Sequence, residues 1–268
     1  MVKEKTLYHY TSIPVLYSIL KNKELWFGNT ARMNDKKEIT FFIENMKTAL
    51  QQDVPQKTEE IEELFNKING RVQNEYPYAM CLSLLNDDVA QWERYADNAK
   101  GIEIGFNVEK LKDLLKDQNV IFNEVFYEKS VKSHEHYNYL KEYILDGNFS
   151  NGFSNIDELI DNFLACSYLF KHPSFKSEKE IRIVTLWKRI PKFSKISCEL
   201  NNGQIKQVLK VKFGDLCKNR NIDFEDLIDE IVIGPRSLQS EKELKLFLKE
   251  IKLEKLVNKV KLSECTLR

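Results

Sequence analysis

The sequence predicts an α+β fold in which a compact antiparallel sheet is covered by packed helices. Strand-like and helix-like runs both occur along the whole chain, but they do not alternate regularly. That irregular order argues against a doubly wound parallel sheet. The chain contains neither an internal repeat nor a low-complexity linker. We therefore expect one domain over residues 1–268, with residues 200–268 as a small appended layer.

Eight segments are rich in β-branched and aromatic residues or alternate apolar with polar side chains, which is typical of strands. In chain order they are TLYHYT (6–11), LWFG (25–28), YAMCLSLL (78–85), GIEIGF (101–106), VIFNEVFYE (120–128), EIRIVTLW (180–187), IKQVLKVKF (205–213) and EIVIG (230–234).

Eight further segments have helical periodicity, and some carry residues that cap a helix start. In chain order they span residues 13–21, 35–51, 58–74, 88–96, 107–116, 134–145, 156–170 and 241–253. Two pairs, Asn34 with Asp35 and Asp87 with Asp88, carry short side-chain oxygens that bind the free N–H groups of a first turn.

Composition limits the class of protein. Hydrophobic residues make up 42% of the 268 residues and charged residues 31%, as in a globular chain. Basic and acidic residues number 41 each, so no bulk attraction to nucleic acid or to a membrane is expected, although a local basic patch stays open. The five cysteines form no CxxC pair, and no apolar run approaches the roughly 20 residues of a membrane span. These features predict a cytoplasmic protein.

The first strand contains the first candidate site. Side chains alternate across a strand, so His9 and Thr11 share one face, and Tyr8 and Tyr10 share the other. One interpretation is that His9 is partly buried and bonds a backbone group. The other is that His9 and Thr11 point into a cleft and contact a ligand. The stretch alone does not decide between them.

The second candidate site is SFKSEKEIRIV (174–184). On a strand, Glu178, Glu180 and Arg182 lie on one face. They form either an exposed charged face, where each cross-strand pair contributes about 0.2–1 kcal/mol, or a functional cluster. Two carboxylates beside an arginine are costly to bury unless they have a function.

The third candidate is the segment 81–106, in which a strand with Ser83 leads into a short helix. Trp92 and Tyr95 lie three residues apart and share a face of that helix. They are either core residues or the wall of a pocket that stacks a planar ligand. A fourth cluster, Asn34, Asp35 and Glu38, is better explained as a helix cap than as a catalytic group.

Six short motifs occur in an order that resembles a bacterial family of uncharacterised cytosolic domains. They lie at Tyr8–Ser12, Asn34–Glu38, Cys81–Ser83, Trp92–Gly101, Glu178–Arg182 and Ile231–Pro235. The resemblance covers nearly the whole chain. One departure is Lys36, where the family pattern has proline.

The start of the chain more distantly resembles DarT-type ADP-ribosyltransferase toxins. The likeness implies a split-sheet transferase core that uses NAD as its substrate and needs no metal. By that likeness His9 and Thr11 hold the adenosine ribose and diphosphate side of NAD, Ser83 matches the second strand motif, and Glu180 is the catalytic glutamate. Glu178 is then the group that activates the acceptor.

The same resemblance assigns the remaining residues of the site. Arg182 either holds Glu180 ionised or contacts the diphosphate, while Tyr10, Trp92 and Tyr95 are aromatic contacts of NAD. Cleavage of the ribose–nicotinamide bond develops oxocarbenium-like charge, which a fixed carboxylate stabilises. Such a site requires no glycine-rich phosphate loop, and the nine glycines form no GxGxxG. The implied partners are a DNA, RNA or protein acceptor and an antitoxin, in bacterial antiviral defence or a toxin–antitoxin system; hydrolysis of NAD without an acceptor is a close variant.

Two other classes of function stay open. Asp35, Glu38, Glu178 and Glu180 could gather a divalent cation in a metal-dependent nuclease, although they lack a recognised metal-loop spacing. The lysine-rich segment 241–261 fits a nucleic-acid or protein binding module. However, its lysines alternate with glutamates beside the apolar residues Leu244, Phe247, Leu248 and Ile251, which is typical of a helix with one solvated face.

Overall fold

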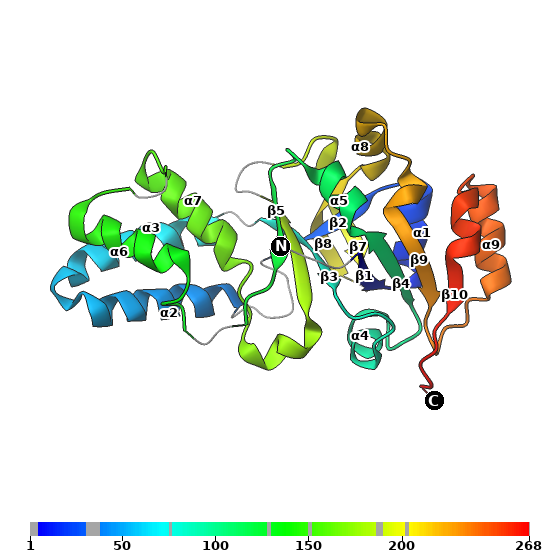
Figure 1. Cartoon of the computed structure of the whole chain (residues 1–268), viewed down its shortest axis with the longest axis horizontal. Coiled ribbons are helices and arrows are strands. Elements are labelled where there is room, and N and C mark those ends of the chain that lie inside the picture. Colours follow the sequence, from blue (N-terminus) through cyan, green and yellow to red (C-terminus); the bar gives the residue numbers. More distant parts are fainter. Residues whose placement is uncertain are drawn as a thin grey trace.

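The computed structural model confirms the α+β class, with a multi-stranded, mostly antiparallel and open sheet surrounded by helices (Figure 1). The structure describes residues 5–30, 38–74, 77–127, 130–149, 152–185, 190–201 and 204–267. None of the helices in these ranges is long and apolar enough to cross a membrane.

The strands are β1 (Thr6–Thr11), β2 (Leu25–Asn29), β3 (Tyr78–Ser83), β4 (Ile102–Asn107), β5 (Val120–Glu124), β6 (Glu180–Thr185), β7 (Ser194–Asn201), β8 (Gln204–Val211), β9 (Ile228–Ile233) and β10 (Val260–Leu262). The α-helices are α1 (Ile13–Asn22), α2 (Glu38–Asp53), α3 (Thr58–Asn74), α4 (Val89–Tyr95), α5 (Val108–Leu115), α6 (Glu135–Asp146), α7 (Ile156–Ser167), α8 (Phe213–Arg220) and α9 (Glu241–Glu250). Short 3-10 helices are η2 (Pro55–Lys57), η3 (Pro173–Glu178), η4 (Phe224–Leu227) and η5 (Glu254–Lys259).

The sheet branches at β3. Its main order is β10-β9-β4-β1-β3-β2-β8-β7, and β6 also pairs with β3 and carries β5 on its other side. Only β9 and β10 pair in parallel among these strands. Residues 200–268, which the sequence allows as an appended layer, contribute β8, β9 and β10 to this same sheet.

The sheet is split between β1 and β2. Ala79 pairs with both β2 and β6, and Ser83 pairs with both β1 and β6, so β1 and β2 share the edge of β3 that lies opposite β6. On that edge β2 pairs with the start of β3 and β1 pairs with its end. Between those two contacts neither β1 nor β2 pairs with β3. Side chains line this part of the edge, and the candidate site lies there.

The two largest hydrophobic clusters of the described residues hold most of the elements. One lies between the sheet and helices α1, α5, α8 and α9, and includes the fully buried Leu20, Phe27 and Leu111. The other lies among α2, α3, α6 and α7, around Phe42 and Phe163, and these four helices form one end of the molecule in Figure 1. The apolar stripe expected on α9 is confirmed, because Leu244 and Leu248 are buried and Phe247 and Ile251 pack on the same core.

Several elements differ from the sequence-based expectation. Strand β7, strand β10 and helix α8 were not expected, and the run predicted as a strand to Phe213 ends at Val211, where α8 follows. The helix expected over 156–170 ends at Ser167. The Asn34–Asp35 helix start lies outside the described residues, and α2 begins at Glu38.

Candidate active site

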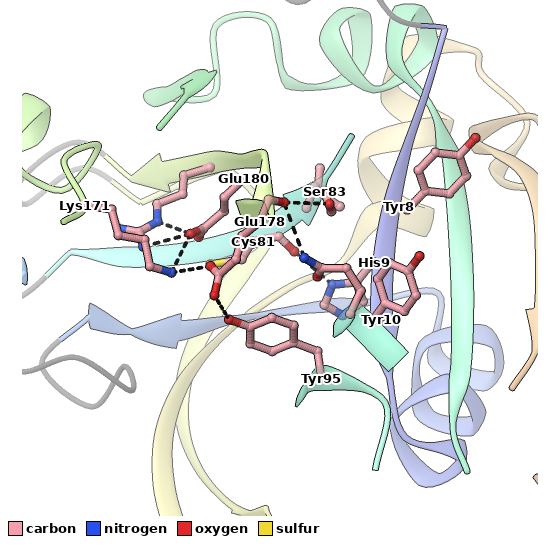
Figure 2. A pocket seen from close by; sticks show the side chains of 12 residues that line it. Tyr8, His9, Tyr10, Cys81, Ser83, Tyr95, Lys171, Glu178 and Glu180 are labelled. Atoms are coloured by element: carbon pink, nitrogen blue, oxygen red, sulfur yellow. Dashed lines mark hydrogen bonds and ion pairs between the residues drawn. The ribbon is translucent and has the colours of Figure 1, made fainter. Parts of the chain in front are cut away.

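A cavity of about 140 Å³ opens where β1, β3 and β6 meet α4 and the segment that follows α7 (Figure 2). Its lining consists of Tyr8, His9, Tyr10, Cys81, Leu82, Ser83, Gln91, Tyr95, Lys171, Glu178, Glu180 and Arg182. Seven of the nine residues that the sequence nominates are therefore brought together here, and Thr11 and Trp92 lie elsewhere.

Strand register explains why such distant segments meet. Tyr8 pairs with Ser83, and Ser83 pairs with Glu180 on the opposite edge of β3. Cys81 pairs with Arg182, two residues further along β6. Because β1 and β6 flank the same strand, side chains from the first and sixth strands reach one cavity across β3.

His9 spans the split in the sheet. Its Nδ1 lies 3.0 Å from the Cys81 carbonyl oxygen, which is an acceptor, so Nδ1 carries the proton and donates this bond. Burial lowers the pKa of His9, against the opposing effect of the bond to Cys81. The imidazole is therefore neutral near pH 7, and its Nε2 is a hydrogen-bond acceptor. His9 therefore bonds a backbone group, as one of the two interpretations expects, and it also lines the cavity.

Glu180 is a buried, ionised carboxylate. Arg182 donates to both of its oxygens, through Nε at 2.6 Å and Nη2 at 3.1 Å, and Lys171 donates from Nζ at 2.9 Å. Burial by itself raises the pKa of Glu180, but Arg182 and Lys171 overcome that effect and lower it to about 2. The exposed charged face considered for this segment is wrong, because Glu180 and Arg182 are only 7% and 3% exposed.

Glu178 reaches the cavity from outside the strand. It ends η3, Lys179 takes a left-handed conformation with φ of 44°, and β6 begins only at Glu180. The Glu178 carboxylate accepts from Lys171 at 2.6 Å, from Tyr95 at 2.9 Å and from Arg94 at 3.1 Å. The expected single strand face is thus wrong for Glu178, yet both carboxylates bind the same Lys171 ammonium (Figure 2).

Ser83 and Tyr10 line the cavity, but their hydroxyl groups are used by the framework. Ser83 Oγ donates to the Glu178 carbonyl at 2.9 Å and accepts from the Leu85 N–H at 3.1 Å. The Tyr10 hydroxyl donates to the Leu85 carbonyl at 2.9 Å and accepts from the Asp88 N–H at 3.0 Å. These bonds fix the loop from which α4 starts, and they leave Tyr10 an aromatic contact surface.

The two aromatic residues of α4 have different surroundings. Tyr95 lines the cavity, is 37% exposed and binds Glu178. Trp92 is fully buried, meets Tyr10 edge-on with ring centroids 5.0 Å apart, and donates from Nε1 to Asp87 at 2.6 Å. Trp92 lines neither the cavity nor the groove beside it. Its ring therefore packs α4 against the core and does not face a ligand.

A groove of about 470 Å³ adjoins the cavity and contains Thr11. His9, Cys81 and Tyr95 line both spaces, so the two spaces are adjacent. On one side the groove follows the end of β1 and the start of α1, and on the other it follows β2 and β8, with Trp26 in its wall. It therefore runs along the split between β1 and β2.

The most important residue that the sequence did not nominate is Lys171. Its side chain is 8% exposed, and its ammonium lies between the two carboxylates. It belongs to the irregular segment between α7 and η3, placed by backbone bonds between Lys171 N and the Phe126 carbonyl and between Phe126 N and the Leu169 carbonyl. No periodic pattern marks such a segment, so no signal in a single sequence identifies this lysine.

The carboxylates of the nuclease alternative are only partly described. Among the described residues, no group of three or more His, Cys, Asp or Glu side chains is placed to hold a metal ion. Glu178 and Glu180 are bound to the Lys171 ammonium. Asp35 lies outside the described residues.

Comparison with protein families gives a match over part of the chain. Residues 91–183 match the model of a family described as a protein of unknown function, DUF2971. The matched third of the chain runs from α4 through β6 and holds Gln91, Tyr95, Lys171, Glu178, Glu180 and Arg182 of the cavity. The comparisons with curated proteins and with solved structures return no match.

Proposed function

We propose that this chain is an ADP-ribosyltransferase-like enzyme that takes NAD as its substrate and transfers ADP-ribose to a macromolecular acceptor. The observation that carries the proposal is the meeting of His9 and Glu180, from strands far apart in the sequence, in one cavity. The cavity opens at a split between strands, and its chemistry matches what cleavage of the nicotinamide–ribose bond needs.

The size of the site supports a long ligand. The cavity alone is about 140 Å³, which is below the roughly 300–1,000 Å³ of typical ligand pockets. The adjoining groove of about 470 Å³ lies within that range. A dinucleotide is extended, and we infer that its nicotinamide ribose enters the cavity while the rest lies in the groove, near Thr11.

The charges suit the reaction. As the bond from ribose C1′ to the nicotinamide nitrogen breaks, its electron pair leaves with neutral nicotinamide and positive charge develops on the sugar. Glu180 is ionised and fixed by Arg182. A carboxylate has about four lone-pair sites, so Glu180 can still accept a hydrogen bond from a ribose hydroxyl. The acceptor nucleophile then bonds to C1′, and its proton passes to Glu178.

His9 is suited to bind the sugar. Its Nε2 accepts hydrogen bonds, and a ribose hydroxyl is a donor. Tyr95 adds an aromatic wall that touches both the cavity and the groove. The role we infer is that of a cytoplasmic bacterial effector in defence or a toxin–antitoxin system, with DNA, RNA or protein as acceptor.

The direct test is release of nicotinamide from NAD by wild type and Glu180→Gln protein, with candidate acceptors present. We expect Glu180→Gln to lower kcat by about 10²-fold or more, because it removes charge that acts mainly in the transition state. Glu63→Gln on α3, an exposed glutamate that lines neither the cavity nor the groove, is the matched control and should keep full activity.

Circular dichroism must show that Glu180→Gln is folded, since Glu180 belongs to a buried ion network. The proposal fails if folded wild-type protein releases no nicotinamide, or if Glu180→Gln turns over at the wild-type rate. Addition of EDTA should leave turnover unchanged. Nuclease activity that EDTA abolishes would instead favour the metal-dependent alternative.

A further inference from the structure

Strand β7 forms an end of the sheet. Among the described residues it pairs with β8 alone, over the eight residues Ser194–Asn201. A strand at a sheet edge presents unpaired N–H and C=O groups, and it is a template for pairing with another chain unless charges, proline or a bulge protect it. The β7–β8 register runs without a shift along its whole length.

The edge also carries exposed apolar side chains. Ile196 is 43% exposed and Leu200 is 74% exposed, and both lie on the same face of β7, as does the exposed Cys198. Ile205 of β8 pairs with Leu200 and is 78% exposed. Single exposed apolar residues are common, but an apolar row on an unpaired edge marks an interaction site.

The hydrogen-bond pattern shows which backbone groups point outward. Phe193 lies opposite Lys212, and its carbonyl accepts from the Lys212 N–H at 3.0 Å. Bonded and non-bonded pairs alternate along an antiparallel ladder. Odd-numbered residues of β7 therefore bond to β8, and the N–H and C=O groups of Ile196, Cys198 and Leu200 face the open edge.

The charges on β7 point to the occupant. Lys195 lies directly opposite Lys210 of β8, and like charges in that position repel. Glu199 binds Lys210 through Oε1 at 2.8 Å, and Ser197 donates to the same oxygen. Lys195 is exposed and would be stabilised by a carboxylate from outside the sheet.

We propose that β7 pairs antiparallel with β7 of a second copy of this chain, about a two-fold axis at Ser197. This register exchanges backbone bonds between Ile196 and Cys198 of the two copies, which are the residues whose groups face outward. It places Lys195 opposite Glu199 of the other copy, twice, and it doubles the apolar row.

Neighbouring two-fold registers satisfy the backbone equally but not the charges. An axis at Cys198 sets Lys195 opposite Asn201, and an axis at Ile196 sets Lys195 opposite Ser197. Only the axis at Ser197 forms both ion pairs, which sit in non-bonded pairs where side chains are closest. The proposal is independent of the proposed NAD chemistry.

Analytical ultracentrifugation over a concentration series tests the proposed dimer, with variants in which the charges of Lys195 and Glu199 are reversed. Wild type should be a dimer whose dissociation constant rises about tenfold in Lys195→Glu, because two attractive cross-strand pairs become repulsive. Glu199→Lys should weaken the dimer similarly. The double variant Lys195→Glu/Glu199→Lys restores opposite charges and should dimerise more tightly than either single variant.

Hydrogen exchange gives a second measurement that does not depend on the variants. The amides of Ile196, Cys198 and Leu200 should exchange more slowly as wild-type concentration rises. A wild-type protein that stays monomeric at high concentration overturns the proposal. So does a dimer that Lys195→Glu leaves unchanged, or a double variant that dimerises no better than the single ones.

Discussion

At the scale of single residues, the site depends on groups held in a defined charge state. Glu180 stays ionised because Arg182 and Lys171 bind it, and His9 stays neutral because burial lowers its pKa by more than the bond to the Cys81 carbonyl raises it. A neutral acceptor and a fixed anion face the same cavity. That pair is what distinguishes this arrangement from an ordinary buried ion network.

The sequence could predict some of these residues and not others. Alternation along the first strand puts Tyr8 and Tyr10 on the face opposite His9, yet all three line the cavity. The segment at Glu180 stands out in the sequence because carboxylates beside an arginine are unusual on an apolar strand. Lys171 was missed because it lies in an irregular segment, where only tertiary contacts fix its place. Trp92 and Tyr95 look alike in sequence, and only packing shows that one is core and the other faces the cavity.

One residue outside the cavity carries a pH prediction. Glu103 is fully buried, its Oε2 accepts from the Asp87 N–H at 2.7 Å, and its Oε1 has no partner among the described residues. Burial raises the pKa of Glu103 from 4.5 to about 7. The folded state therefore holds a proton that the unfolded state has lost, and stability falls as pH rises from about 4.5 to 7.

Glu103→Gln removes this pH dependence, because the amide keeps the bond to Asp87 without ionising. Below pH 4.5 the variant and wild type should be about equally stable, and above pH 7 the variant should be more stable by about 3 kcal/mol. Urea unfolding across this pH range measures the difference. A gap between the two proteins that does not change with pH would refute the assignment, and Glu63→Gln should show no such trend.

At the scale of elements, backbone contacts explain the glycine that ends the motif at 92–101. A Cβ on Gly101 would lie 2.1 Å from the Thr11 carbonyl oxygen and 2.9 Å from that of Ala96. Gly101 thus lets the chain after α4 pass close to the end of β1. The glycine of this motif therefore has a structural role, because it allows α4, with Tyr95, to pack against β1.

Gly101→Ala should destabilise the protein by about 2 kcal/mol or more, since neither contacting backbone can move freely. Gly70→Ala is the matched control: Gly70 lies inside α3, where an added Cβ meets nothing within 4 Å, so it should stabilise by about 1 kcal/mol. Thermal denaturation compares the two. If Gly101→Ala and Gly70→Ala changed the stability equally and in the same direction, the close approach of the backbone at Gly101 would be contradicted.

Element types were easier to predict than their ends. The strand predicted at 180–187 begins at Glu180, as expected, but Glu178 does not share its face, because Glu178 belongs to η3 and Lys179 takes a left-handed conformation before the strand. Strand β7 was not predicted, although polar and apolar side chains alternate from Lys195 to Leu200, which is itself a strand pattern.

At the scale of the whole molecule, the sequence predicts the class but not the order of strands. The residues within each half of the site lie close together in the sequence. The cavity between the halves exists because β1 and β6 pair with opposite edges of β3, while β2 pairs with another part of the edge that β1 uses. Together those pairings bring His9 and Glu180, which are 171 positions apart in the sequence, to the same cavity. A single sequence carries no record of such register. The split and its groove therefore emerge only in three dimensions.

The central claim is that this split binds NAD, and the thermal midpoint of wild-type protein with and without NAD tests it most directly. A ligand that binds only the folded state, present at 100 times its dissociation constant, adds about 2.7 kcal/mol of stability. We predict a clear rise in the midpoint with NAD, which His9→Ala abolishes and Glu63→Gln retains. Midpoints that stay the same with saturating NAD would contradict the account.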